Sequence, residues 1–345
     1  MSDLTVAVVG CGLIGAKRAM ALAPEDRLVG CYDVNAEAAA SFAAKHETRA
    51  CSSLDELLAI GADVVVVATV HDQLAGLAEA AMRAGAHVLV EKPAGISTRQ
   101  LDSLIECRHA SGRLVKVGFN HRFHPGIARA AEEVHSGRHG ELMYLRGRYG
   151  HGGRIGYDRE WRAEPARSGG GELIDQGMHL LDLSHWLAGP LALHSALLRT
   201  QFWDTPVEDN AALVLGAAQS RSDPWAMLHV SWTEWKNLFS LEVYCRTAKI
   251  QVDGLVRSYG AQQLRIYKMS PELGPPQLEH VEYPDEDGSW DREWAGFKAA
   301  IAASDDALIN GGLEDARYAW EQIEAAYASG PYSEMRRSVD PQPSR

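Results

Sequence analysis

The chain has 345 residues, of which 46% are hydrophobic and 23% charged, a balance typical of folded globular proteins rather than disordered or fibrous ones. Its length suggests about two domains. The 34 basic and 46 acidic side chains give a formal net charge of −12, which disfavours nucleic acid and anionic membrane surfaces as partners. No apolar run reaches the roughly 18 residues of a membrane span and no basic leader precedes the first strand, so we expect a cytoplasmic protein.

A valine-rich apolar run over residues 4–9 predicts a buried parallel strand, and a glycine cluster follows it. The cluster has the spacing G-x-G-x-x-G and precedes an alanine-rich helical stretch. Glycine allows a tight turn at the first position, close approach of a diphosphate at the second, and close packing of helix on strand at the third. The helix N-terminus supplies N–H groups for the phosphates. We therefore predict a dinucleotide-binding loop made of Gly10, Gly12, Leu13, Ile14 and Gly15.

Asp33 ends the second predicted strand, residues 28–32, and stands 18 positions after Gly15. An acid at this place accepts hydrogen bonds from both ribose hydroxyls and repels the additional phosphate of NADP. Because no arginine occurs in residues 34–36, we predict NAD in preference to NADP. The alternative is a glycine turn in an α/β protein that holds no cofactor.

Strands expected at 63–68, 86–90 and 115–119 alternate with helical stretches at 36–45, 53–60, 73–84 and 97–111. This order predicts a doubly wound parallel sheet of about six strands, a Rossmann domain over residues 1–121. Ligands of such sheets bind at the carboxyl ends of the strands. The polar residues that follow these ends are Thr69, His71, Glu91, Lys92, Asn120 and Arg122.

In the second half, a run of three glycines leads to Asp175 and His179, which share one face if the stretch is helical. Oxidation of an alcohol by NAD requires a base for the hydroxyl proton and a group that stabilises the developing negative charge. A carboxylate beside an imidazole orients it and raises its basicity, and Lys92 is suited to stabilise the substrate oxygen. A structural ion pair that caps a helix is the alternative for Asp175 and His179.

A Rossmann half that closes on Glu91-Lys92-Pro93, followed by Gly169-Gly170-Gly171 and the D-x-G-x-H of residues 175–179, resembles the Gfo/Idh/MocA oxidoreductases, named for glucose-fructose oxidoreductase and inositol dehydrogenase. The resemblance implies that Lys92, Asp175 and His179 are catalytic, with Lys92 and His179 as candidates for proton transfer. The chain departs from the family after Ala68, where many members carry Thr-Pro-Asn before a histidine. This chain has Thr69-Val70-His71-Asp72, so a solvated or helix-capping His71 is the alternative to cofactor contact.

A strand expected at 141–149 is followed by a glycine-rich loop of the kind that carries specificity. Planar donors and an indole in this region suit a polyol, or a substrate with a phosphate or nucleotide, although ordinary exposed arginines are an alternative. The residues predicted to bind substrate are Asn120, Arg122, Tyr149, Arg154, Trp161, Arg162, Asp175 and His179. A metal held by Asp175, His179 and His121 has no diagnostic spacing, and we predict none.

Alternating segments at 213–215, 226–232, 239–246 and 249–252 predict a largely antiparallel open sheet flanked by helices, closed by helices at about 290–303 and 313–328. We assign residues 122–335 to a substrate-binding and oligomerisation domain and 336–345 to a loose tail. An outer face covered by Trp225, Trp232, Trp235 and Tyr244 predicts a homodimer or homotetramer through this sheet, as the family resemblance also suggests.

These features favour an NAD(P)-dependent dehydrogenase or reductase acting on a CH–OH carbon of a sugar, a sugar derivative or a cyclitol. An NAD-dependent glycosidase that oxidises its substrate transiently is one alternative. A non-catalytic regulator that senses sugar or dinucleotide on the same fold is the other, and the presence of Lys92, Asp175 and His179 argues against it.

Overall fold

A computed structural model describes residues 3–216, 222–272, 274–328 and 330–339. The chain divides into two compact units, which we describe separately. Unit 1 contains residues 1–120 and 289–317, and unit 2 contains 121–288 and 318–345. Residues 289–317 were predicted to belong to the second domain at 122–335, whereas in the structure this segment belongs to unit 1. Part of the predicted loose tail is also helical, and residues 340–345 of it lie outside the described part.

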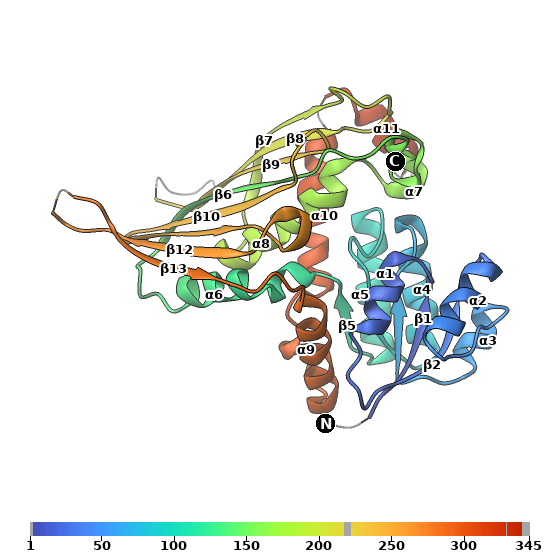
Figure 1. The fold of residues 1–345 in the computed structure, drawn as a ribbon. Helices are drawn as coiled ribbons and strands as arrows, with labels where there is room; N and C mark the ends of the chain where they lie inside the picture. Colours follow the sequence, from blue (N-terminus) through green and yellow to red (C-terminus); the bar gives the residue numbers. More distant parts are fainter. Residues whose placement is uncertain (1–2, 217–221, 273, 329, 340–345) are drawn as a thin grey trace. The chain divides into compact units, whose positions relative to one another are not determined.

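Unit 1 is built on a parallel sheet with helices around it (Figure 1). In the described residues the sheet has five strands in the order β2-β1-β3-β4-β5, so the prediction of about six was one too high. Its strands are β1 (Thr5–Val9), β2 (Arg27–Tyr32), β3 (Val64–Val67), β4 (His87–Val90) and β5 (Val115–Val117). Its helices are α1 (Leu13–Met20), α2 (Ala36–Lys45), α3 (Leu54–Leu58), α4 (His71–Arg83), α5 (Thr98–Ser111) and α9 (Ser289–Ala303).

Valine side chains fill the core of unit 1 because strands covered on both faces need apolar residues at every position. All four residues of β3 are buried valines. Helix α9 joins this core through Trp294 and Phe297, which belong to the same apolar cluster as Val6 and Val64. The indole N–H of Trp294 also donates to Asp26 at 2.7 Å. These contacts explain why a segment so late in the sequence belongs to the first unit.

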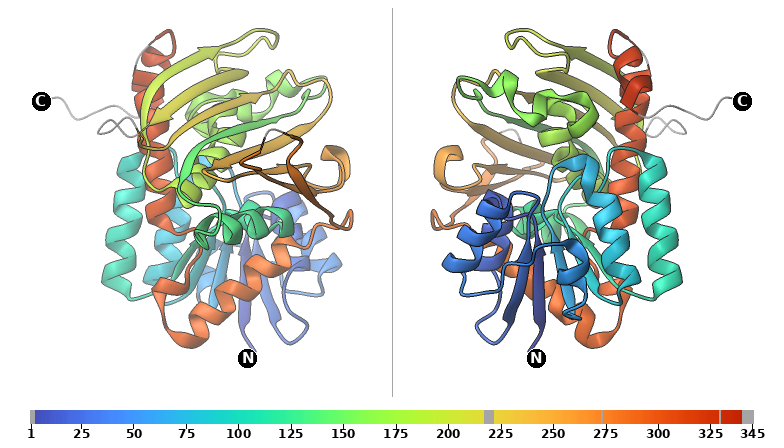
Figure 2. Two further views of the ribbon diagram at one scale, coloured as in Figure 1. Left: turned by 90° about the vertical axis from the view of Figure 1, so that its left-hand side faces the viewer. Right: turned by 90° about the vertical axis from the view of Figure 1, so that its right-hand side faces the viewer.

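Unit 2 is built on an open sheet, visible from both sides in Figure 2. Among the described residues it has eight strands in the order β13-β12-β11-β10-β6-β9-β8-β7, antiparallel except for the pair β6 and β9. Its strands are β6 (Leu142–Gly150), β7 (Ala192–Arg199), β8 (Asn210–Gly216), β9 (Trp225–Ser231), β10 (Leu238–Cys245), β11 (Ala248–Asp253), β12 (Gln263–Lys268) and β13 (Gln277–Glu282). Its helices are α6 (Pro125–His135), α7 (Pro165–Ser168), α8 (Met178–Ala188) and α11 (Ser333–Val339). Helix α10 (Leu313–Ala328) crosses the division between the units.

One face of the larger sheet packs on α6 and α8, which lie beneath it in Figure 1. The other face carries stacked aromatic rings, with 4.3 Å between the centroids of Tyr144 and Tyr244 and 5.0 Å between those of Tyr144 and Trp225. Trp232 was predicted on that outer face, and this was wrong. It is 1% exposed and packs in a small core with Tyr157, because its position continues the inward-facing alternation of Ala226, Leu228 and Val230 rather than the outward-facing one of Trp225.

Candidate active site

The glycine loop of unit 1 has the geometry that a diphosphate requires. Gly10 has φ +96°, and a Cβ there would lie 2.3 Å from the carbonyl oxygen of Ala68. A Cβ on Gly15 would lie 2.0 Å from the oxygen of Gly10, so the helix approaches the strand too closely for any side chain. Gly12 is the N-cap of α1, whose first turn holds Leu13 and Ile14 and presents its N–H groups at the loop.

Asp33 is tied to this loop directly. Its Oδ2 atom accepts the N–H of Cys11 at 2.8 Å, and its Oδ1 atom accepts the N–H of Asn35 at 2.8 Å. A carboxylate held beside the second residue of the glycine loop is placed to accept ribose hydroxyls. The glycine cradle and this carboxylate therefore fit a dinucleotide of the NAD type.

The next cofactor candidates follow the neighbouring strands β3 and β4, whose carboxyl ends meet at the same sheet edge as that of β1. Thr69 lies against the glycine turn, with its methyl 3.0 Å from the position of a Cβ on Gly10. His71 begins α4 and is 5% exposed, so it is not a solvated side chain. Lys92 is half-buried directly after β4 and precedes a cis peptide bond to Pro93.

Glu91 belongs to a buried network of four charges in unit 1. The guanidinium of Arg18 lies 2.5 Å from Glu91 and 2.5 Å from Glu293 of α9, and Lys116 lies 2.8 Å from Glu293. Burial raises the pKa of Glu91, although Arg18 opposes the shift. Two cations and two anions balance each other, which permits their removal from water. The structure thus places Glu91 inside the unit, and cofactor contact by its side chain stays a prediction.

Two residues predicted to bind substrate make buried contacts with protein partners. Asn120 donates its amide to Ser289 at 3.0 Å within unit 1. In unit 2, the Nε atom of Arg122 lies 3.2 and 3.0 Å from the two carboxylate oxygens of Asp182, and Nη2 lies 2.5 Å from one of them. Both members of this ion pair are at most 3% exposed. A buried bidentate pair of this kind holds its two segments together, so Arg122 ties the start of unit 2 to helix α8 through Asp182.

Asp175 lies in the π-helix Leu173–Gly177, which runs directly into α8. A π turn is rare in proteins, and those that occur are frequently found at functional sites. The Oδ2 atom of Asp175 accepts Nε of Arg162 at 3.2 Å and the hydroxyl of Tyr157 at 3.5 Å. Burial alone would lower the pKa of Arg162, but the carboxylate of Asp175 raises it overall. Arg162 therefore stays cationic beside the Asp175 carboxyl group.

His179, in the first turn of α8, is 6% exposed and packs among rings. Its imidazole stacks on that of His121, with 3.7 Å between centroids and 22° between planes. Tyr149 lies 6.2 Å from His179 by ring centroid, and burial raises the pKa of its hydroxyl well above the ordinary value. A phenol held neutral in this way can donate a hydrogen bond but does not serve as a base near pH 7.

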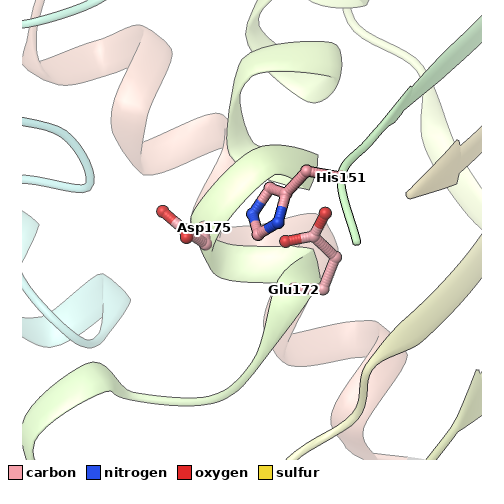
Figure 3. A group of neighbouring side chains, drawn as sticks. All are labelled: His151, Glu172 and Asp175. Carbon is pink, nitrogen blue, oxygen red and sulfur yellow. The ribbon is translucent and has the colours of Figure 1, made fainter. Parts of the chain in front are cut away.

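A second cluster surrounds Asp175, drawn in Figure 3 with His151 and Glu172. Among the described residues these three offer ligand atoms within 4.8 Å of one another, as a metal site would. However, Nδ1 of His151 accepts the N–H of Gly153 at 2.9 Å, so the neutral ring carries its proton on Nε2. With Nδ1 engaged and Nε2 protonated, the ring has no lone pair for a metal. We assign the cluster to hydrogen bonding, with His151 as a donor near two carboxylates.

The remaining substrate candidates lie in the loop region between β6 and α7. Arg154 is exposed and pairs with Glu160 at 2.6 Å. Trp161 receives the guanidinium of Arg162 over its ring, 4.6 Å from the centroid. Arg162 is thus the member of this group that the structure brings to Asp175, whereas Arg154 is engaged by a surface acid.

Four residues of this region escaped the sequence prediction: His151, Tyr157, Glu172 and Glu208. Glu172 is completely buried. A glutamate beside apolar residues such as Leu173 and Ile174 could have been recognised from the sequence as a buried charge, and buried charges are rare unless they are paired or functional. The other three occur in loop stretches without periodicity, so nothing in the sequence distinguished them from solvated polar residues.

The comparisons with known proteins match both parts of the chain. Residues 4–119 match the oxidoreductase family with an NAD-binding Rossmann fold, and residues 127–251 match the GFO/IDH/MocA C-terminal domain. The chain belongs to the Gfo/Idh/MocA oxidoreductase family, which confirms the resemblance. Its N-terminal unit is an NAD-binding Rossmann domain. No helix among the described residues has the length and apolar character needed to cross a membrane.

Individual relatives are similar over parts of the chain. UDP-N-acetylglucosamine 3-dehydrogenase of Acidithiobacillus ferrooxidans is 37% identical over 127 residues, 37% of this chain and 40% of that protein. Inositol 2-dehydrogenase 2 of Saccharopolyspora erythraea is 30% identical over 216 residues, 59% of this chain and 61% of that protein. The matches thus span less than two thirds of either relative. A solved levoglucosan dehydrogenase, in complex with NADH and levoglucosan, has the same fold, with TM-score 0.83 and 19% identity over 97% of this chain and 98% of that one.

Proposed function

We propose that this protein is an NAD-dependent dehydrogenase that oxidises a secondary CH–OH carbon of a sugar, a sugar derivative or a cyclitol. The observation that carries the proposal is the polar group on the π-helix, where Arg162 and Tyr157 both donate hydrogen bonds to Asp175, four residues before the buried His179. The sugar and cyclitol names of the relatives support the same substrate class. A donor-rich cluster of this kind suits a polyhydroxylated ring.

In the proposed reaction the substrate carbon loses a hydride, its hydroxyl loses a proton, and a ketone forms. NAD, when bound, accepts the hydride. His179 takes the hydroxyl proton, since an imidazole titrates near neutral pH. Lys92 stabilises the negative charge that develops on the substrate oxygen, and it is the other candidate for proton transfer. Arg162 and Tyr157 hold the Asp175 carboxylate, which is proposed to orient His179.

Gly10, Gly12, Gly15 and Asp33 are proposed to hold the dinucleotide, with Leu13, Ile14, Thr69, His71 and Glu91 in its surroundings. The Asp33 carboxylate favours NAD over NADP because it would repel a phosphate on the ribose. Tyr149, Arg154, Trp161 and Arg162 remain the proposed substrate contacts from unit 2. Asn120 and Arg122 act as positioning residues, since their side chains are bonded to Ser289 and Asp182.

The face of the larger sheet that carries Tyr144, Trp225 and Tyr244 is proposed to bind a second copy of the chain. Met227 and Trp225 on this face are 44% and 37% exposed, and large apolar side chains exposed in this way are often covered in homo-oligomers. Ion pairs of Glu242 with Arg146 and Lys249 border the aromatic rings on the same face.

The test is a panel of myo-inositol, UDP-N-acetylglucosamine, levoglucosan and glucose, each incubated with the protein and NAD or NADP, with absorbance read at about 340 nm, the NADH band. We expect NADH formation with at least one of these compounds and slower reduction of NADP. Cleavage of a glycoside without net NADH would favour the glycosidase alternative. Binding of NAD and sugar without any turnover would favour a sensor.

A further inference from the structure

Asp175 and His179 lie on one helical stretch, and the residues just before it are held by an anchor of hydrogen bonds that the proposed mechanism does not use. The π-helix Leu173–Gly177 and α8 form one continuous helical stretch that begins just after the triple glycine. The first N–H groups of any helix lack partners within the helix. In a buried stretch such as this one, each of these donors needs an acceptor from elsewhere in the fold.

Glu208, in the segment before β8, supplies that acceptor. Its carboxylate accepts the N–H of Gly171 at 3.2 Å and that of Leu173 at 3.0 Å. The hydroxyl of Tyr327, from α10, lies 2.8 Å from both carboxylate oxygens. The carbonyl of Glu208 also accepts the N–H of Glu172 at 3.0 Å. Glu208 thus engages three consecutive backbone N–H groups and is completely buried.

The glycines of the run are required by this anchor. A Cβ on Gly170 would lie 2.1 Å from the Tyr327 hydroxyl oxygen, and a Cβ on Gly171 would lie 2.1 Å from the Glu208 carbonyl oxygen. Both distances are far shorter than any van der Waals contact. Glycine is therefore required at positions 170 and 171, because Tyr327 and Glu208 occupy the space that a side chain would need.

We propose that Glu208, with Tyr327, is a positioning residue that sets the register of the helix carrying Asp175 and His179. This inference rests on the proposed function, since it assigns a role within that reaction. Asp175 comes two residues after the last N–H that Glu208 engages, so a shift of the anchor moves Asp175 first. A displacement of about 1 Å at a reacting group costs on the order of 100-fold in rate.

Ionisation of Glu208 gives the anchor a measurable signature. Burial raises the pKa of Glu208 to about 7, while the Tyr327 hydroxyl and the backbone N–H groups oppose the shift. Among the described residues, the charged and titratable groups near this pair include Arg336, Tyr332, Arg199 and the adjacent Asp209. The anchor thus changes its charge close to neutral pH.

Hydrogen exchange followed by mass spectrometry tests the anchor without reference to activity. In Glu208→Gln and Tyr327→Phe, amides of residues 171–175 are expected to exchange about tenfold faster or more, because their acceptor is weakened. Tyr318→Phe is the matched control. Tyr318 lies on the same helix, α10, and its hydroxyl is hydrogen-bonded to the N–H and the carbonyl of Leu191. The Tyr318→Phe variant should therefore speed exchange at the Leu191 amide and leave residues 171–175 protected. Equal effects of Tyr327→Phe and Tyr318→Phe on residues 171–175 would overturn the proposal.

Kinetics then separate positioning from stability. With whichever panel compound the wild-type protein oxidises, Glu208→Gln is expected to lower kcat about tenfold to 100-fold and leave the Kd for NAD unchanged. An inflection near pH 7 in the kcat profile of the wild type should shift or vanish. Unchanged kcat and pH profile in Glu208→Gln would contradict a positioning role even if exchange increases. If the wild type oxidises nothing, the proposed function fails, and the exchange experiment still decides whether the anchor exists.

Discussion

Arg18 shows how a single side chain connects distant parts of unit 1. It extends from α1, whose N-terminus forms the dinucleotide loop, to Glu91 beside Lys92 and to Glu293 in α9. Trp290 covers its guanidinium at 4.3 Å. The loop and the strand end that carries Lys92 are therefore held by the same cation.

We predict that Arg18→Met destabilises the protein by about 3–5 kcal/mol, because it leaves buried carboxylates without their partner. Urea unfolding monitored by tryptophan fluorescence measures this change. The control is Arg83→Met, which removes an arginine from an exposed pair with Glu79 and should cost less than about 1 kcal/mol. Equal losses in the two variants would show that the buried network contributes nothing specific.

The residues of the candidate site were predictable from the sequence to different degrees. The glycine loop and Asp33 could be predicted because the backbone conformation of the loop requires particular residues at fixed spacing, and a short motif shows that spacing. The polar residues Asn120 and Arg122 were expected at a ligand, yet they are bonded to Ser289 and Asp182. A sequence shows that a polar side chain stands near a strand end but not which distant partner satisfies it.

At the scale of elements, the close contact between α1 and β1 depends on glycine. We predict that Gly15→Ala abolishes measurable NAD binding, since its Cβ would lie 2.0 Å from the oxygen of Gly10 and the loop must open to accommodate it. Isothermal titration with NAD checks this. Gly76→Ala, in α4 where a Cβ meets nothing within 4 Å, should bind NAD normally and be more stable by about 0.5–1 kcal/mol. Normal NAD binding by Gly15→Ala would refute the assigned role of the loop.

The elements that were not predicted include α6 and β12, in which apolar residues do follow a helical or an alternating pattern, as well as two exposed strands. Strands β7 and β13 are largely exposed, so their sequences lack the alternation by which β8 to β11 were recognised. The π-helix was expected to be an ordinary helix turn, because a single wide turn leaves the spacing of Asp175 and His179 unchanged. The helices at 289–303 and 313–328 were predicted closely, but their membership of units depends on long-range packing that no local pattern encodes.

For the molecule as a whole, the stability should depend on pH through Glu208. Its pKa in the folded state, about 7, exceeds the ordinary value of 4.5, so the folded protein binds this proton more tightly than the unfolded chain. The stabilisation is full below about pH 4.5 and is lost as pH rises to about 7, a change of about 3 kcal/mol. Urea unfolding at a series of pH values should show a shallower decline for Glu208→Gln across this window. Parallel curves for wild type and variant would contradict the assignment.

The proposed association through the larger sheet predicts that Trp225→Arg yields a smaller species, because it removes the indole that stacks on Tyr144 and adds a further cation to this face. Size-exclusion chromatography with light scattering measures the mass. Trp235, 68% exposed and packed on Phe202 in the turn after β9, provides the control, and Trp235→Arg should leave the mass unchanged. A wild-type protein of monomer mass would refute the proposal.

The most direct test of the central claim is NADH formation by three proteins, the wild type, Lys92→Ala and His179→Ala, with the panel compound that the wild type oxidises. NAD affinity should be measured in parallel by fluorescence titration. We predict that each variant loses on the order of 100-fold or more in kcat, the usual contribution of a positioned proton-transfer group, and that His179→Ala retains NAD binding within about threefold. Turnover by either variant at the wild-type rate would contradict the account.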